Sequence, residues 1–249
     1  MTDEPMSPDA VPGVSPPRLP GPLTLAGVSL AFLVVHALAL APVALVAHRA
    51  FQDGLGHGMW RSLVAALVLT ADLALLPVLL VACSGAAGLV LAPRYTGRHP
   101  LDFRLPALKR WLLSLAIYFP TAVLLDLFHL YPLKSLHIRC FGGRVARGAV
   151  VGGLVTDPSL VEIGAGSIVG GFSNLLGHAV ERGEVVFDTI HIGAGCGVGA
   201  RAVVLPGSVI EDGGLLAAAS LLPKGARIPA GATFAGVPAR SARVLRGRQ

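Results

Sequence analysis

The chain has 249 residues, of which 53% are hydrophobic and 14% charged, and its formal net charge is +6. A mean hydropathy of +0.70 lies well above that of soluble globular proteins and predicts a membrane portion. We therefore attribute the excess of basic residues to membrane topology and anionic-lipid contact. A nucleic-acid partner is discounted, because aromatic residues make up only 6% of the chain and do not interleave with basic runs.

The three cysteines, Cys83, Cys140 and Cys196, lie far apart in the sequence and form no CxxC pattern. An odd number at such spacing argues against both a zinc site and a disulfide framework. We therefore predict no metal site.

The N-terminal segment Met1–Pro22 contains seven prolines and no apolar periodicity, which predicts a disordered tail over residues 1–22. It begins with Asp3 and Glu4 rather than with basic residues, so a signal peptide is not expected.

Two apolar runs follow, Leu23–Ala47 and Ser62–Ala92, and the polar, Gly-rich segment His48–Arg61 connects them. Each run is long enough to cross a hydrocarbon core of about 30 Å. The sequence therefore predicts a two-helix transmembrane hairpin over residues 23–92.

Two ionisable residues, His36 and Asp72, lie near the middle of these runs. Such a group inside a membrane suggests a function by default. One interpretation is a mutual contact that only locks the hairpin together, and the other is a role in substrate passage.

Residues 93–144 are predicted to form a basic loop and an interfacial or re-entrant helix. The loop carries Arg94, Arg98, Arg104, Lys109 and Arg110, which places it and the N-terminal tail in the cytoplasm by the positive-inside rule. The apolar stretch Trp111–Tyr131 has basic residues on both flanks. We prefer an interfacial helix to a third span, because it keeps both flanks on one side.

From Val145 onward the chain repeats every six residues. The first position of each hexad is apolar in thirteen of fourteen cases, and Asp157 is the exception. The position four residues further on is small in eleven of thirteen cases, and glycine recurs beside the first position. This period excludes a helix and predicts a solenoid, with three short parallel strands per turn forming a triangular prism over residues 145–240. A basic tail, residues 241–249, follows.

The hexads resemble the hexapeptide-repeat acyltransferase superfamily, and IPAGATFAGVPAR (Ile228–Arg240) is similar to the closing turn of that superfamily. The resemblance implies an all-β left-handed parallel β-helix, here preceded by the α-helical membrane hairpin and the interfacial helix. It also implies a homotrimer.

A closer resemblance is to one membrane-anchored C-terminal unit of ε-poly-L-lysine synthetase and related nonribosomal-peptide-synthetase-like proteins. It is carried by YPLKSLHIRCFGGRVARGAVV (Tyr131–Val151), TDPSLVEIG (Thr156–Gly164) and GHAVERG (Gly177–Gly183). Unlike that family, this chain has one unit, no adenylation domain and no carrier-protein motif.

The resemblance implies that the donor is a thioester of CoA or of a carrier-protein phosphopantetheine, used as a co-substrate rather than as a bound cofactor. A carrier protein or an adenylation enzyme is therefore a possible partner. The donor arm would run along the later coils, past Ala217, Lys224 and Ala235, with Lys224 meeting a CoA phosphate or remaining a surface lysine.

The stretch Asn174–Ile192 interrupts the repeat and holds a cluster of titratable residues: His178, Glu181, Arg182, Glu184, Asp188 and His191. Histidine suits a general base, because its pKa lies near neutrality. His178 matches the histidine of the family's His-x-x-Glu pattern, and Glu181 is predicted to orient it or to hold a cationic acceptor. His191 is the second candidate. Asp157 is interpreted as the mark of a distorted corner rather than as a second base.

These features predict a membrane-anchored acyl- or aminoacyltransferase that moves an acyl group from a thioester to an amine or hydroxyl. The alternative is a non-catalytic membrane-anchored scaffold of a peptide synthetase complex. A γ-type carbonic anhydrase uses the same prism but needs three converging histidines, and the repeat holds only His178 and His191.

Overall fold

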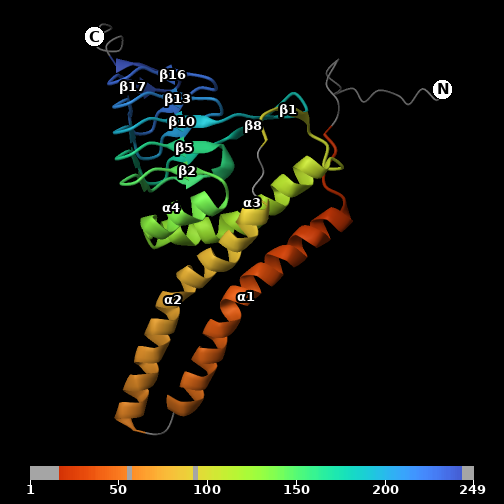
Figure 1. Cartoon of the computed structure of the whole chain (residues 1–249), viewed down its shortest axis with the longest axis vertical. Helices are drawn as coiled ribbons and strands as arrows, with labels where there is room; N and C mark the ends of the chain where they lie inside the picture. The colour runs from red at the N-terminus through yellow and green to blue at the C-terminus, as the bar shows by residue number, and fades with distance from the viewer. Residues whose placement is uncertain (1–16, 55–57, 92–94, 243–249) are drawn as a thin grey trace, which may run out of the picture.

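Two long apolar helices form the lower half of the molecule (Figure 1). The computed structural model describes residues 17–54, 58–91 and 95–242, and the helices are α1 (Pro22–Gly54) and α2 (Met59–Leu91). Many of their leucines and valines point outward, with Leu33 60% and Leu67 63% exposed. Both helices are long and apolar enough to cross a membrane.

The two ionisable residues of the hairpin are both buried, but they do not hydrogen-bond to each other. His36 Nδ1 lies 2.8 Å from the carbonyl oxygen of Phe32 in its own helix, and its Nε2 has no partner in the described chain. The structure therefore shows no hydrogen bond between His36 and Asp72 that would lock the hairpin.

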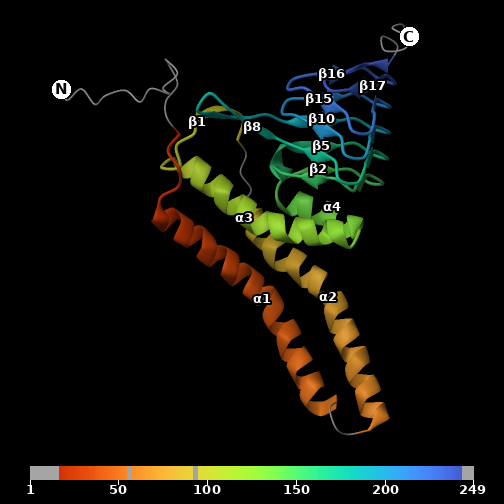
Figure 2. The same cartoon turned by 180° about the vertical axis from the view of Figure 1, so that it is seen from behind.

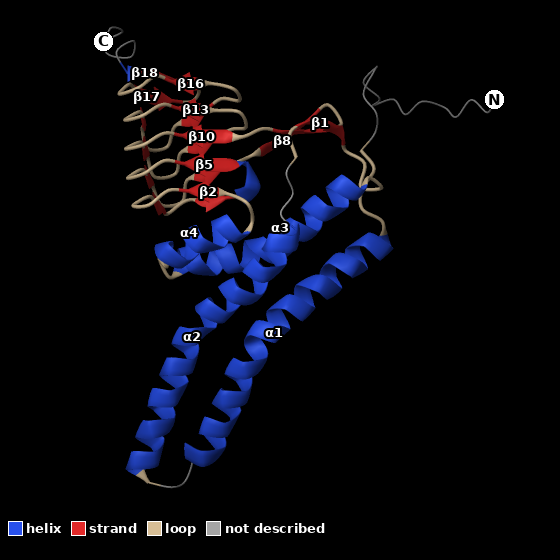
Figure 3. Ribbon diagram, viewed as in Figure 1, coloured by secondary structure: helices blue, strands red, loops and turns tan. Residues whose placement is uncertain are grey.

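Helices α3 (Pro106–Leu127) and α4 (Tyr131–Cys140) lie crosswise between the hairpin and the β-structure (Figure 3). By length and composition α3 also qualifies as a membrane span. However, 39% of its apolar window is buried against the rest of the protein, compared with 6% for α1 and 11% for α2. This helix therefore supports the upper domain as well as bordering the hairpin.

Helix α4 is fixed to the first coil of the β-structure by two cations. The fully buried Lys134 Nζ lies 2.6 Å from the carbonyl oxygen of Gly153 and also pairs with the Asp126 carboxylate. Arg139 donates from Nε to the carbonyl oxygen of Val145 at 2.9 Å. Both acceptors are backbone groups at the lower rim of the prism.

The β-structure above α4 is a parallel β-helix of three sheets. Figure 2 shows its coils stacked on α4, seen from behind. The first sheet contains β2 (Arg144–Val145), β5 (Val161–Ile163), β10 (Ile190–Ile192), β13 (Val209–Ile210) and β16 (Arg227–Ile228). The second contains β3 (Val150–Val151), β6 (Ile168–Val169), β11 (Gly197–Val198), β14 (Leu215–Leu216), β17 (Thr233–Gly236) and the antiparallel β18 (Ala239–Ser241). The third contains β4 (Leu154–Val155), β7 (Asn174–Leu175), β12 (Val203–Val204) and β15 (Leu221–Leu222).

The aliphatic positions of the hexads fill the prism. Val151, Leu175, Val204 and Leu216, for example, are 0% exposed. The sequence register is wrong at one point, because Val155 rather than Asp157 occupies the interior of the first coil and pairs with Leu175. Asp157 instead opens an enlarged corner that contains a 3-10 turn, η1 (Pro158–Leu160).

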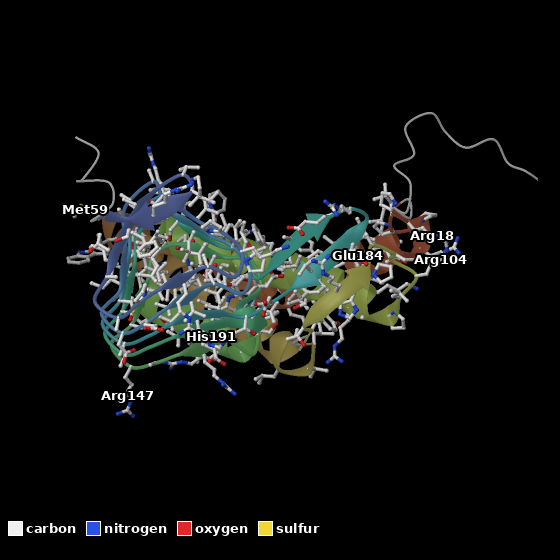
Figure 4. All side chains as sticks on the ribbon, turned by 90° about the horizontal axis from the view of Figure 1, so that it is seen from above. Arg18, Met59, Arg104, Arg147, Glu184 and His191 are labelled. Atoms are coloured by element: carbon white, nitrogen blue, oxygen red, sulfur yellow. The ribbon has the colours of Figure 1, made fainter. Side chains whose placement is uncertain are left out.

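The interruption of the repeat forms a hairpin of strands β8 (His178–Glu181) and β9 (Glu184–Phe187). Strand β1 (Gly97–Pro100), from the segment that follows α2, pairs antiparallel with β9 and makes a small three-stranded sheet. Seen from above, the hairpin projects from the prism and carries Glu184 toward Arg18 and Arg104 (Figure 4). Arg18, within the segment predicted to be disordered, bridges to Asp102.

Candidate active site

His178 and Asp157 form a hydrogen-bonded pair at one corner of the prism. His178 Nδ1 lies 2.6 Å from Asp157 Oδ2, and the indole N–H of Trp111 donates to Asp157 Oδ1 at 2.9 Å. The three residues come from different elements: the start of β8, the corner of the first coil and helix α3. We call this group the Trp–Asp–His chain.

The Trp–Asp–His chain fixes the chemistry of the imidazole. Because a carboxylate only accepts hydrogen bonds, Nδ1 must carry the proton, and Nε2 is left as a free base in the neutral ring. The Asp157 side chain is 3% exposed and that of His178 is 20% exposed, so the imidazole is partly open to solvent while its carboxylate partner is buried. Trp111 meets the imidazole edge-on, with ring centroids 4.8 Å apart. This arrangement suits proton transfer at Nε2.

The backbone beside His178 leaves no room for a side chain. A Cβ atom on Gly177 would lie 2.8 Å from Leu160 Cβ and 2.9 Å from Asp157 Cβ. Glycine at this position therefore allows the corner of the second coil to stack closely on the enlarged corner of the first. That close stacking brings the two members of the pair within hydrogen-bonding distance.

Glu181 does not orient His178, which was one of the two roles expected for it; it pairs with Lys224. Its Oε2 lies 2.5 Å from Lys224 Nζ, which reaches down from a later corner, and this hydrogen bond lowers the pKa of the Glu181 carboxyl. Asp157, not Glu181, contacts the imidazole of His178. The reason is strand geometry: residues 178 and 181 are an odd number apart, so their side chains leave opposite faces of β8.

The three residues predicted to lie along the thioester donor do not form one group on the prism. Ala217 and Ala235 are stacked on successive coils of the second sheet, where the Ala217 N–H donates to the carbonyl oxygen of Phe234 at 2.8 Å. Lys224 follows β15 of the third sheet and is engaged with Glu181. The structure therefore groups the two alanines together and groups Lys224 with the hairpin.

A second histidine–carboxylate pair lies on the outer side of the first sheet. His191 Nδ1 is 3.0 Å from Glu162 Oε2, and Arg144 Nη1 is 2.7 Å from Glu162 Oε1. These residues line an open groove of about 920 Å³ that continues to Glu211 and Asp212. The His191 side chain is 49% exposed and that of Glu162 is 36% exposed, so this pair is far more solvated than the pair at the corner.

No group of three or more His, Cys, Asp or Glu side chains is placed to bind a metal ion within residues 17–54, 58–91 and 95–242.

Several solved structures are similar to about half of the chain. A hexapeptide-repeat acetyltransferase from Vibrio cholerae is 16% identical over 52% of this chain and 92% of its own, with a TM-score of 0.41. A maltose O-acetyltransferase from Clostridium difficile is 15% identical over 51% and 86%, with a TM-score of 0.40. A galactoside acetyltransferase in complex with coenzyme A is 21% identical over 52% and 82%, with a TM-score of 0.38. No protein-family model and no curated protein matches the chain.

Sequence reasoning missed two of the three members of the Trp–Asp–His chain. The signal for Asp157 was present, because it is the one polar residue at a hexad position that is otherwise apolar. Trp111 gave no such signal, since an aromatic residue in an apolar helix is usually part of a core. Its contact with Asp157 spans 46 residues of sequence.

Proposed function

We propose that this protein is a membrane-anchored acyltransferase with His178 as general base, moving an acyl or aminoacyl group from a thioester to an amine or hydroxyl. The observation that carries the proposal is the 2.6 Å contact between His178 Nδ1 and Asp157 Oδ2, with the second carboxylate oxygen held by Trp111. The resemblance of the hexads to the hexapeptide-repeat superfamily supports the thioester donor. CoA and carrier-protein phosphopantetheine supply the same pantetheine thiol.

The reaction follows from the free Nε2 atom. Nε2 takes the proton of the acceptor amine or hydroxyl while the acceptor atom attacks the thioester carbonyl. A C–N or C–O bond forms, the tetrahedral intermediate collapses with cleavage of the C–S bond, and the imidazolium returns its proton to the leaving thiolate. Asp157 stabilises the imidazolium during this exchange, and Trp111 holds the carboxylate in place.

The proposed cellular arrangement places α1 and α2 across the membrane, α3 along its cytoplasmic surface, and the left-handed prism and N-terminus in the cytoplasm. The bare apolar flanks of the hairpin and the crosswise position of α3 support it. Three copies would associate through their prisms, and a carrier protein or adenylation enzyme would deliver the donor where CoA does not.

The proposal is tested with purified full-length protein, acyl-CoAs and a carrier-loaded aminoacyl thioester, with products identified by mass spectrometry. His178→Ala is expected to lower the transfer rate by about a hundredfold or more, the usual contribution of a general base. His191→Ala is the matched control, and it removes the solvated pair without touching the Trp–Asp–His chain. Unchanged transfer in His178→Ala, or loss confined to His191→Ala, contradicts the assignment.

A further inference from the structure

A cleft of about 550 Å³ lies between α1 and α2 at the end of the hairpin far from the prism. The cleft is lined by the apolar side chains of Val46, Val64 and Val68 and by three residues nearer the tip of the hairpin: Arg49, Trp60 and Arg61. Val64 is 55% exposed and Trp60 74% exposed, so the apolar walls continue onto the outer surface of the hairpin. The cleft thus joins two cations to an exposed apolar surface.

Among the described side chains, no carboxylate pairs with either arginine of this cleft, Arg49 or Arg61. Asp53 is the only acidic residue between positions 48 and 61, so this end of the hairpin keeps an excess of positive charge. Arg61 also lies in the first turn of α2, where the helix dipole disfavours a cation. An anion bound by both arginines would offset the excess positive charge and the unfavourable interaction of Arg61 with the helix dipole.

Trp60 indicates the depth at which that anion would lie. Tryptophan side chains concentrate at the level of lipid headgroups, because one part of the ring is apolar and its N–H is polar. Trp60 adjoins Arg61 and lines the same cleft. The cations are therefore at headgroup level, while the valine walls lie on the side where acyl chains run.

We propose that the cleft binds an anionic membrane lipid, with its phosphate held by Arg49 and Arg61 and an acyl chain lying against Val46, Val64 and Val68. Guanidinium groups bind phosphate oxygens through paired, charge-assisted hydrogen bonds. The apolar walls favour a lipid over free phosphate, because only a lipid covers them. The proposal rests on the hairpin lying in a membrane, but it does not require acyl transfer.

The experiment uses the purified full-length protein in a neutral detergent, titrated with phosphatidylglycerol or phosphatidylcholine, with bound lipid counted by native mass spectrometry. We expect one molecule of phosphatidylglycerol to bind in preference to phosphatidylcholine. The double variant Arg49→Gln and Arg61→Gln is expected to weaken phosphatidylglycerol binding about a hundredfold, because it removes two charge-assisted hydrogen bonds that each contribute about tenfold. Inorganic phosphate in large excess is expected to displace none of it.

Two further variants test whether lipid binding depends on this cleft rather than on total charge. Arg147→Gln with Arg201→Gln removes the same charge from exposed corners of the prism and is expected to leave lipid binding unchanged. Ala65→Leu keeps both arginines but fills part of the cleft, and it is expected to weaken binding. Equal binding by wild type and the Arg49/Arg61 variant overturns the proposal. So does equal loss in the prism control, or displacement of the lipid by inorganic phosphate. Transfer activity is not measured, so failure here is distinct from failure of the acyltransferase assignment.

Discussion

At the residue scale, the identity of the atom that Asp157 presents to His178 determines which imidazole nitrogen is basic. Trp111 donates to Oδ1, so this position requires an oxygen. In Asp157→Asn the new amide would therefore turn its nitrogen toward His178 Nδ1, which becomes the acceptor, and Nε2 carries the proton. This is the wrong tautomer for a base, and we expect transfer to fall by about a hundredfold or more.

The same geometry supplies the control for this prediction. Adding Trp111→Phe to Asp157→Asn removes the indole N–H and frees the amide to present its oxygen to Nδ1. The double variant is then expected to transfer faster than Asp157→Asn alone, in the same mass-spectrometric assay. A slower double variant would show that Trp111 acts through packing only.

His137 gives a second prediction at this scale, in the pH dependence of stability. It is fully buried on α4, its Nε2 lies 2.9 Å from Ser84 Oγ, and burial together with the His36 charge lowers its pKa to about 3. In the unfolded chain its pKa is about 6.5. Between these values the unfolded state binds a proton that the folded state does not, so stability falls as the pH falls below about 6.5.

The expected loss from this residue between pH 7 and pH 5 is about 2 kcal/mol, measured as a decrease in Tm of the detergent-solubilised protein. His137→Gln is expected to flatten this part of the pH profile. The exposed His48→Gln is the matched control and should keep the wild-type slope. A wild-type slope in His137→Gln would mean that this imidazole is charged in the folded protein.

At the element scale, the two stacked corners of the prism control the distance between His178 and Asp157. A Cβ atom on Gly177 would lie under 3.0 Å from the Cβ atoms of Leu160 and Asp157, and neither can move without its backbone. Gly177→Ala is therefore expected to separate the coils, costing about 1–3 kcal/mol of stability and most of the transfer activity.

Gly171→Ala is the matched control for this effect, because the nearest atom to its Cβ would be a carbonyl oxygen at 4.0 Å. Thermal unfolding and the transfer assay, run on both variants, distinguish local crowding from a general intolerance of alanine in the coils. Normal activity in Gly177→Ala would contradict the corner-stacking explanation.

The elements themselves were largely predictable, whereas their contacts were not. The period of six placed Val169, Val198 and Leu216 in a prism interior, because each strand repeats one inward-facing position. The six-residue register breaks between Val151 and Val155, where the corner is shorter. As a result, Val155 takes the interior position that the register gives to Asp157. Such a corner depends on which coil stacks above it. A single sequence does not contain that information, nor the pairing of His178 with a carboxylate 21 residues away.

At the scale of the whole molecule, the position of α3 decides on which side of the membrane the prism lies. If α3 lies along the surface, the C-terminus is on the same side as the N-terminus; if it spans, the two ends are on opposite sides. We expect a fluorescent protein fused after Gln249 to fold in the cytoplasm, and alkaline phosphatase inserted between α1 and α2 to be active outside. Activity of a second alkaline phosphatase fusion, placed after Gln249, would make α3 a third span.

The attachment of α4 beneath the prism has a consequence for self-association. The lowest coil of a β-helix exposes a row of backbone groups that can template another strand, as any free sheet edge does. Here Lys134 and Arg139 occupy the carbonyl oxygens of Gly153 and Val145 at that rim. The helix thus covers this end of the solenoid and hinders end-to-end strand pairing from below.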